Sequence, residues 1–198
     1  MRILFAAPDR ELLRCYEILL AGPGRAVETA FDGVQVLRLL AEGDWDLLIL
    51  SRDIPRIDWR RILEHCDRGG PPVLVLTAKA PDLGLLLEPV LAQDYLPLPF
   101  LPSELEARVE ALAAALASPK VLTLEGREIP LAGFRLGKAP VTLPELRYLE
   151  ALLDGTPPPE DRMVMGALNE KLQAQGFRHR IRYRAMVGYR LIVEGDEK

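Results

Sequence analysis

The sequence has little of what metal centres, disulfide frameworks and membrane spans are built from. Its 198 residues include two cysteines and two histidines, and these four side chains show no spacing typical of zinc sites. Cys15 and Cys66 both fall in segments with helical periodicity, which favours buried reduced thiols. The first apolar run, residues 3–7, is too short for a signal-peptide core or a membrane span. We therefore expect a cytoplasmic protein without a metal or cofactor.

Charge is distributed unevenly along the chain. The overall composition, with 49% apolar and 27% charged residues, is ordinary for a globular protein. Residues 1–118 carry a net charge of −6 and residues 119–198 carry +2. Residues 178–190 contain five arginines and no acid. This division predicts two domains with different roles, with any nucleic-acid contact in the second.

The first part of the chain alternates short apolar runs with segments of helical periodicity. Five strands alternating with five helices predict an α/β fold, a doubly wound parallel sheet of the flavodoxin type with strand order 2-1-3-4-5. Asp9 and Ser103 are candidate helix caps. The expected strands are residues 2–6, 26–29, 47–50, 73–76 and 94–96, and the expected helices are residues 9–20, 33–41, 59–65, 83–91 and 101–116.

The segment 46–59 contains the central strand of this expected sheet. Leu47–Leu50 is apolar throughout, which is typical of a strand buried on both faces. It ends at Ser51, on the sheet edge where open α/β folds place their chemistry. With Asp46, Pro55 and Asp58, the segment resembles the third strand and following loop of bacterial response-regulator receiver domains.

A second segment supports the same resemblance. Residues 93–100 read Gln-Asp-Tyr-Leu-Pro-Leu-Pro-Phe, close to the Asp-Tyr-Leu-x-Lys-Pro-Phe pattern of receivers, and residues 102–109 are similar to their fifth helix. The resemblance covers residues 1–117, which it identifies as a receiver-like domain. It also implies a homodimer surface on the fourth helix, fifth strand and fifth helix. The residues expected there are Leu85, Asp94, Tyr95 and Arg108. In the alternative interpretation, the leucines of this surface simply cover the sheet and its charged side chains are solvated.

The phosphorylation site implied by this resemblance is degenerate. Ala7 and Pro8 stand where receivers have two magnesium-binding carboxylates, Ser51 replaces the phosphoacceptor aspartate, and Leu98 replaces the invariant lysine. Only Thr77 matches, at the position of the hydroxyl switch residue. Aspartyl phosphorylation needs a carboxylate nucleophile, a divalent cation and a cation beside the product. We therefore expect a pseudo-receiver without phosphotransfer or other enzymatic activity.

Residues 121–198 are predicted to form a small α+β domain after a linker at residues 118–120. Glu125-Gly126 lies between two alternating segments and indicates a hairpin turn. Gly176 is expected to end the second helix. The expected strands are residues 121–124, 127–131, 134–136, 140–143, 180–184 and 189–193, and the expected helices are residues 144–153 and 161–175.

Three segments of this part resemble the winged-helix output domain of OmpR/PhoB-type response regulators: residues 141–149, 168–172 and 187–191. The resemblance implies a DNA-binding transcription regulator, but the chain departs from it at three places. A proline run, residues 157–159, occupies the space of the positioning helix. The recognition helix begins with the apolar segment Met163–Leu168, whereas base edges are read by polar side chains. Ala185 stands where a wing arginine is expected to contact the minor groove.

The remaining basic residues allow two interpretations. Four arginines alternate at period two and would share one face of a strand, either solvated or bound to DNA phosphates. Two functions thus stay open: a phosphorylation-independent transcriptional regulator that binds DNA through a basic wing, or a protein-interaction module that contacts a polymerase subunit, a kinase or another regulator through Met163–Leu168. The candidate DNA-contacting residues are Lys171, Arg178, Arg180, Arg182, Arg184 and Arg190.

Overall fold

The computed structural model describes residues 1–78, 92–117, 121–131, 134–158, 161–184 and 188–193. Described residues up to 111 belong to one compact unit, and those from 112 onward belong to a second. The predicted linker, residues 118–120, and the predicted fourth helix, residues 83–91, lie outside the described residues, as does Leu85. Among the helices that are described, none combines the length and the apolar character needed to cross a membrane.

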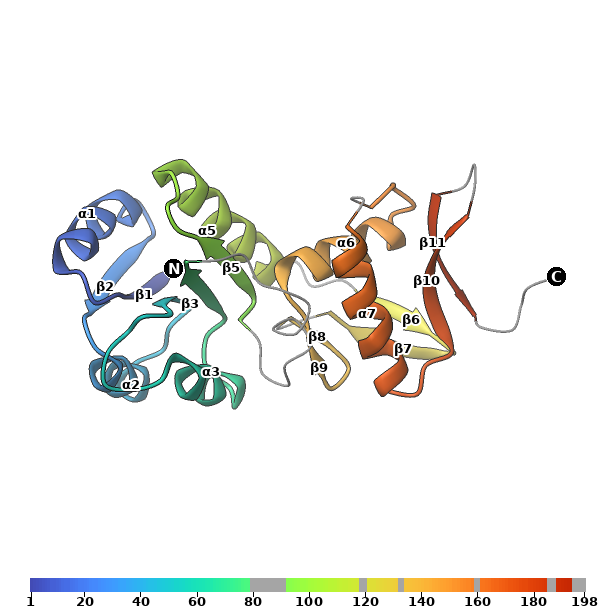
Figure 1. Cartoon of the computed structure of the whole chain (residues 1–198), viewed down its shortest axis with the longest axis horizontal. Coiled ribbons are helices and arrows are strands. Elements are labelled where there is room, and N and C mark those ends of the chain that lie inside the picture. Colours follow the sequence, from blue (N-terminus) through green and yellow to red (C-terminus); the bar gives the residue numbers. More distant parts are fainter. Residues whose placement is uncertain (79–91, 118–120, 132–133, 159–160, 185–187, 194–198) are drawn as a thin grey trace. The chain divides into compact units, whose positions relative to one another are not determined.

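The first unit is built on a five-stranded parallel sheet with strand order β2-β1-β3-β4-β5 (Figure 1). The predicted 2-1-3-4-5 order and the flavodoxin-like fold class are confirmed. Helices α1 and α5 cover one face of the sheet, and α2 and α3 cover the other (Figure 1). The strands are β1 (Arg2–Ala6), β2 (Ala26–Ala30), β3 (Leu47–Ser51), β4 (Val73–Thr77) and β5 (Asp94–Pro97), and the helices are α1 (Arg10–Leu20), α2 (Gly33–Glu42), α3 (Trp59–Asp67) and α5 (Pro102–Ala117).

The central strands of this sheet form the core of the first unit. All residues of β3 and β4 are buried, as are all residues of β1 after the first. The residues Leu47 to Leu50 have no exposed surface, as expected for a strand covered by helices on both faces. Because β1 pairs directly with β3, the sheet brings Ala7, which follows β1, and Ser51, which ends β3, to the same edge.

The first three helices of this unit begin at aspartates. The predicted cap Asp9 is confirmed, because its Oδ1 accepts hydrogen bonds from the backbone N–H groups of Glu11 (2.8 Å) and Leu12 (3.2 Å). Asp32 and Asp58 cap α2 and α3 in the same way. Each carboxylate satisfies backbone donors that the helix itself leaves without partners.

The predicted cap Ser103 is wrong. Ser103 lies inside α5, whose first residue is Pro102. Proline suits that position because its missing N–H would have no partner there. The preceding residue, Leu101, has no polar side chain, and its backbone N–H instead donates to Glu104 Oε2 at 2.8 Å. This hydrogen bond is one of the two that form a capping box. The helix therefore begins at Pro102, one residue before Ser103.

The described residues from 121 onward form three two-stranded antiparallel sheets and two helices. The predicted hairpin turn is confirmed: Glu125 and Gly126 both have positive φ angles, 50° and 74°, as the tightest hairpin turns require. Gly176 follows the end of α7 with φ 77°. The strands are β6 (Val121–Leu124), β7 (Arg127–Pro130), β8 (Arg135–Leu136), β9 (Ala139–Pro140), β10 (His179–Arg184) and β11 (Gly188–Val193), and the helices are α6 (Leu143–Leu153) and α7 (Arg162–Ala174).

The apolar start of α7 is largely buried within the second unit. Val164, Ala167 and Leu168 are at most 5% exposed, whereas Met163 is 37% exposed. Residues 154–158, the described part of the connection between α6 and α7, form no helix. Most of the apolar surface in the segment from Met163 to Leu168 therefore packs into the core of its own unit.

The core of the second unit contains one poorly satisfied polar group. The Tyr148 hydroxyl is buried, and no hydrogen-bond partner for it occurs among the described residues. The Tyr148 ring packs edge-on against Tyr189, with ring centroids 6.1 Å apart. Burial, with smaller effects of Tyr189 and Asp161, raises the pKa of Tyr148 to about 12.

Replacing Tyr148 with phenylalanine is expected to stabilise the protein by about 1 kcal/mol at neutral pH, because it removes a desolvated hydroxyl and keeps the ring. The raised pKa also makes stability depend on pH. The free energy of unfolding is unaffected below the pKa of tyrosine in the unfolded chain, near 10, and it falls as the pH rises toward the pKa of Tyr148 in the folded protein, about 12. The variant should lose part of that alkaline fall. Urea unfolding at several pH values measures the gain at neutral pH and the alkaline loss of stability. A variant that is less stable than the unaltered protein at neutral pH would contradict the expected gain.

Candidate functional site

The first candidate site lies at the carboxyl edge of the parallel sheet. Ala7, Ser51 and Thr77 follow or end adjacent strands and are 2%, 6% and 3% exposed. The Ser51 Oγ accepts a hydrogen bond from the backbone N–H of Asp53 at 3.3 Å. Leu98 is 37% exposed, and its N–H donates to the Thr77 carbonyl at 2.7 Å. The structure thus assembles the receiver-type edge with a serine that organises its own loop.

The donors at this edge do not suit magnesium. Magnesium prefers carboxylate and water oxygens in octahedral geometry, but Ala7 and Pro8 offer no side-chain oxygen. The nearby carboxylate Oδ1 of Asp9 already caps α1. Among the described residues, no group of three or more His, Cys, Asp or Glu side chains is placed to hold a metal ion. Ala7 and Pro8 therefore supply no carboxylate to this edge of the sheet.

A tryptophan and two arginines follow this edge. Trp59, which stands where receivers have glycine, is 5% exposed and begins α3. The guanidinium carbons of Arg52 and Arg60 lie 5.4 and 4.8 Å from its ring centroid. Both distances fit cation–π attraction. The loop after β3 and the start of α3 therefore place two cations next to an aromatic ring.

The predicted dimer surface is only partly exposed. Asp94 and Tyr95 are 2% and 5% exposed, so neither reaches the surface. Arg108 donates to both Asp94 carboxylate oxygens, at 3.2 and 2.9 Å, within one chain, and the Arg108 side chain is 39% exposed. The Tyr95 hydroxyl accepts from the Ala92 N–H at 3.3 Å. Of the described residues of this surface, Arg108 alone offers a partly exposed side chain.

The second candidate site is the β10–β11 hairpin, the arginine hairpin. Its register places Arg182 opposite Arg190, and Arg180 opposite Ile192. Residues two apart on a strand share a face, so these arginines lie on one face and Ile181 on the other. Ile181 is 1% exposed, and its backbone N–H and C=O both bond to the Asn169 amide of α7. The arginine face is therefore the outer face of the hairpin.

The predicted arginines of this face differ in their surroundings. Arg178 and Arg182 are exposed, whereas Arg180 and Arg190 are half-buried. Arg180 donates to the backbone carbonyls of Phe177 and His179 at 2.7 and 2.8 Å. Arg190 donates to the Tyr189 carbonyl at 2.8 Å. The side chain of Arg184 lies outside the described atoms.

Lys171 does not lie with these arginines. Its side chain is 7% exposed, and its ammonium donates to both carboxylate oxygens of Glu145 at 2.7 Å. Glu145 is completely buried and closes a capping box with Thr142 at the start of α6. Burial lowers the pKa of Lys171, and the neighbouring Glu145 charge opposes that effect. The expectation that Lys171 contacts DNA is corrected, because this cation already has a buried partner.

Another charged contact fixes the beginning of the arginine hairpin. Glu125, in the turn between β6 and β7, accepts a hydrogen bond from the Arg178 N–H at 2.7 Å. Its Oε1 also lies 3.4 Å from His179 Nδ1. The hydrogen bond from the Arg178 backbone contributes most to lowering the pKa of Glu125, and His179 lowers it further. The sequence indicates Glu125 only as a turn residue, because its partners are more than fifty positions away.

Curated relatives of the chain are transcriptional and response regulators. Transcriptional regulatory protein CutR of Streptomyces coelicolor is 33% identical over 163 residues, which cover 77% of this chain and 75% of the relative. The chain belongs to the OmpR family of response regulators. Because 77% of the chain exceeds its first 117 residues, the similarity reaches into the second unit. No family model matches the sequence.

Two further relatives match this response regulator over a shorter stretch. TctD of Salmonella typhimurium is 36% identical over 115 residues, and MprA of Mycobacterium avium is 36% identical over 122 residues. Each match covers 57% of the chain and about half of the relative.

Solved structures similar to this response regulator are receiver domains. Chemotaxis response regulator CheY4 of Vibrio cholerae superimposes with a TM-score of 0.52 and 21% identity, covering 56% of this chain and 97% of the other. The receiver domain of Francisella response regulator 1452 gives a TM-score of 0.51 and 25% identity, covering 57% and 96%. These likenesses establish the fold of the first unit.

Proposed function

We propose that this response regulator is a transcriptional regulator that binds DNA through the outer face of its arginine hairpin and works without aspartyl phosphorylation. The observation that supports DNA binding is the cross-strand pair of Arg182 and Arg190, with Arg180 on the same face. A phosphate backbone supplies anions at regular spacing, so guanidinium groups that share one face of a hairpin can each contact a phosphate.

The proposed contacts are mainly to phosphates. Phosphate contacts fix position and provide affinity without specifying sequence. The exposed side of α7, the expected recognition helix, presents Met163, Glu170 and Gln173 beside Arg162. An exposed glutamate is repelled by the DNA backbone, and methionine offers no hydrogen bond to a base edge. We therefore propose strong salt dependence and weak discrimination between DNA sequences.

The test is fluorescence anisotropy of the full chain with mixed-sequence duplex DNA, titrated from low to physiological salt. Each neutralised phosphate contributes about −0.9 to the slope of log K against log salt. Three arginines contacting phosphates therefore predict a slope of about −3 for each bound chain. A slope near zero, or no binding at low salt, would remove the DNA-binding proposal.

Phosphorylation independence rests on the chemistry of the sheet edge. Incubation with acetyl phosphate and magnesium is expected to leave the protein unmodified, because Ser51 has no base or metal ligand beside it. Replacing Ser51 with aspartate should not restore modification, since Ala7 and Pro8 still supply no carboxylate. Intact mass spectrometry measures the result, with a receiver of ordinary site composition as the positive control. An added phosphoryl group on the unaltered protein would contradict the proposal.

A second candidate function is supported by α7 itself. Met163 is exposed and Met165 half-buried on a helix that also exposes Glu170, and flexible methionines are common on protein-binding surfaces. In this alternative, the winged-helix-like unit contacts a protein such as a polymerase subunit, a kinase or another regulator. Loss of DNA binding at low salt, combined with weaker partner binding by a Met163→Glu variant, would favour it.

A homodimer of the receiver-like domain remains part of the proposal. Arg108 is the residue of the expected surface that the structure leaves partly exposed, and Asp94 and Tyr95 would act by positioning it. Sedimentation velocity at high micromolar concentration tests this directly. A single monomeric species at those concentrations would exclude the dimer.

A further inference from the structure

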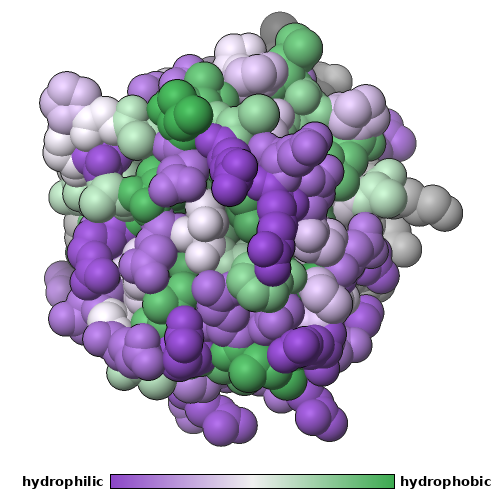
Figure 2. All heavy atoms as spheres, turned by 90° about the vertical axis from the view of Figure 1, so that its left-hand side faces the viewer, coloured by the Kyte–Doolittle hydropathy of each residue, from purple (hydrophilic) through white to green (hydrophobic). Residues whose placement is uncertain are grey.

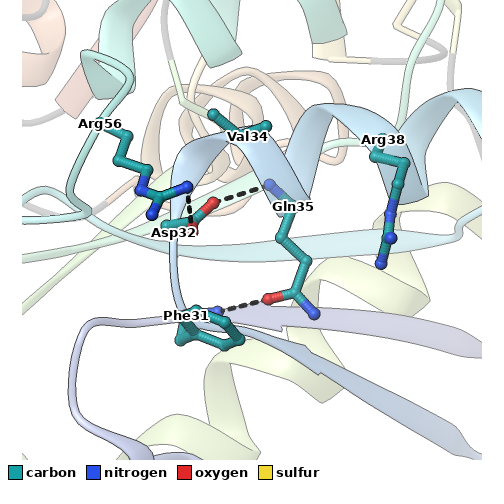
Figure 3. A pocket seen from close by; sticks show the side chains of 6 residues that line it. All are labelled: Phe31, Asp32, Val34, Gln35, Arg38 and Arg56. Carbon is teal, nitrogen blue, oxygen red and sulfur yellow. Dashed lines mark hydrogen bonds and ion pairs between the residues drawn. The ribbon is translucent and has the colours of Figure 1, made fainter.

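A shallow hollow of about 230 Å³ opens on the first unit beside the amino end of α2 (Figure 3). It is smaller than the pockets of roughly 300–1,000 Å³ that bury small ligands, and it is open to solvent. A hollow of this size fits one or two side chains of a larger partner. The residues lining it are Phe31, Asp32, Val34, Gln35, Arg38 and Arg56, none of which belongs to the degenerate phosphorylation site, the dimer surface or the arginine hairpin.

The centre of the hollow is held in place by hydrogen bonds. Asp32 is 5% exposed, and its Oδ1 accepts from the Gln35 N–H at 2.8 Å. In return, Gln35 Oε1 accepts from the Phe31 N–H at 3.1 Å. Gly33 packs so closely that a Cβ there would lie 2.5 Å from the Ile57 Cβ. The hollow is therefore a preformed feature in which α2 and the loop after β3 are locked together.

Cations stand on both sides of this centre. Figure 3 shows Arg56 and Arg38 on opposite sides of Asp32 and Gln35. Their side chains are 67% and 61% exposed, and each lies near one acid, with 3.5 Å from Arg56 to Asp32 and 3.9 Å from Arg38 to Glu42. The Arg38–Glu42 pair is exposed on both sides and is therefore weak, whereas Asp32 is buried and also accepts from the Gln35 N–H. Both guanidinium groups stay largely exposed, so an added carboxylate can reach them.

The backbone of Arg56 is in an unusual conformation. Its φ angle is 73°, in the left-handed region that residues other than glycine rarely adopt. The conformation is kept by its neighbours: the Pro55 carbonyl accepts hydrogen bonds from the N–H groups of both Gly33 and Ile57. Strained residues held in this way concentrate at binding sites. The residue in this conformation is one of the two arginines that line the hollow.

Exposed apolar side chains lie between these cations. Phe31 and Val34 are 39% and 49% exposed, and the Arg10 guanidinium carbon lies 4.2 Å from the Phe31 ring centroid. In Figure 2, which views the first unit from the side of α1 and α2, apolar side chains emerge in separate spots among strongly hydrophilic ones. Aromatic and arginine side chains together are the usual composition of binding hot spots.

We propose that this hollow docks an acidic segment of a partner protein, which packs an apolar side chain on Phe31 and Val34 and places carboxylates on Arg38 and Arg56. The arginines define the charge of the partner, and the apolar pair favours a polypeptide over a phosphate backbone. The net charge of −6 on residues 1–118 acts against a long polyanion, whereas a short segment meets mainly the local cations, since physiological salt screens charges beyond about 8 Å. The docking site is independent of DNA binding by the second unit.

The test uses fluorescence anisotropy of the full chain with a labelled short peptide of alternating glutamate and leucine. Matched probes replace leucine by alanine, replace glutamate by lysine, or substitute a single-stranded oligonucleotide of equal net charge. The glutamate–leucine peptide is expected to bind with a Kd on the order of 100 µM. The alanine peptide should bind several-fold more weakly, and the lysine peptide should show no binding. Because the arginine hairpin also attracts anions, each probe is repeated on the variants below.

Charge reversal of Arg38 and Arg56 to glutamate should weaken peptide binding at least about tenfold. Phe31→Ala should weaken it several-fold while leaving the charge unchanged. The matched control reverses Arg68 and Arg127, which are exposed and lie outside the hollow, and should leave binding unchanged. Thermal unfolding checks each variant, with glutamine at positions 38 and 56 as a milder replacement if the reversal unfolds the domain.

Three results would overturn the proposal. The first is equal loss of binding in the control and in the variant, which would show attraction by net charge alone. The second is an oligonucleotide that binds as tightly as the peptide and depends on Arg38 and Arg56, which would assign the hollow to nucleic acid. The third is self-association that the same reversal abolishes, which would assign it to a second copy of the chain.

Discussion

Replacing Lys171 with methionine is expected to lower the free energy of unfolding by about 3–5 kcal/mol, because the variant keeps a buried carboxylate and removes its counter-charge. Glu145 has no exposed surface, and its carboxylate oxygens both lie 2.7 Å from the Lys171 ammonium. Glu145 also accepts from the Thr142 N–H, so a change in its charge state reaches the capping box of α6. The loss should therefore be concentrated in α6 and α7.

Two matched variants separate the charge effect from packing. Combining Glu145→Gln with Lys171→Met removes both charges and should recover most of the lost stability, because buried ion pairs are often replaceable by neutral groups. Lys138→Met, at an exposed lysine of the same unit, should change stability by less than about 0.5 kcal/mol. Equal destabilisation in the single and double variants would show that shape, and not charge, controls this part of the core.

The measurement must follow the second unit itself. Both tryptophans, Trp45 and Trp59, lie in the first unit, so their fluorescence does not report directly on α6 and α7. Hydrogen exchange of peptides from these helices, read by mass spectrometry, gives the local opening free energy. A K171M variant with unchanged exchange in both helices would contradict the expected effect.

Reversing Arg182 and Arg190 to glutamate is expected to lower DNA affinity about a hundredfold at low salt and to reduce the magnitude of the salt slope by about two. The two residues are cross-strand neighbours on the outer face of the hairpin, so one phosphate group can contact both. The reversal replaces two attractive contacts with two repulsive ones. Anisotropy with the same mixed-sequence duplex measures affinity and slope together.

Conservative and control variants define what this result means. Lysine at positions 182 and 190 keeps the charge and should retain most of the affinity, because phosphate contacts depend mainly on charge. Reversing Arg127 and Arg147, which are exposed in the same unit, changes the net charge equally and should cost much less affinity. Equal losses in both double reversals would indicate a diffuse electrostatic effect and would remove the hairpin as the DNA-binding surface.

The regular part of the fold could be predicted from the sequence because its signals are local. Leu47–Leu50 is wholly apolar, so its burial on both faces followed from composition. Asp9 lies directly before a helical pattern, and Glu125-Gly126 separates two alternating strands. In each case neighbouring residues determine the structure, and the structure confirms the strand order, the cap and the turn.

Residues whose environment depends on distant partners could not be predicted in this way. Lys171 was grouped with the hairpin arginines because it is basic and near them in sequence, but its burial depends on Glu145, twenty-six positions earlier. The Thr142-x-x-Glu145 spacing is a readable capping signal, yet it gives no indication of the lysine. The hollow has the same origin, since Arg56 approaches Asp32 only after β3 has joined the sheet.

The tryptophan between Arg52 and Arg60 gives this response regulator an intrinsic optical probe. Indole emission depends on nearby charge and on solvent access. Trp59 is buried, and the guanidinium carbons of Arg52 and Arg60 lie 5.4 and 4.8 Å from its ring centroid. It begins α3 directly after the loop that carries Arg56. A partner that moves this loop would shift the colour and lifetime of the emission without any attached dye. Binding of such a partner can therefore be followed by fluorescence in the unmodified protein.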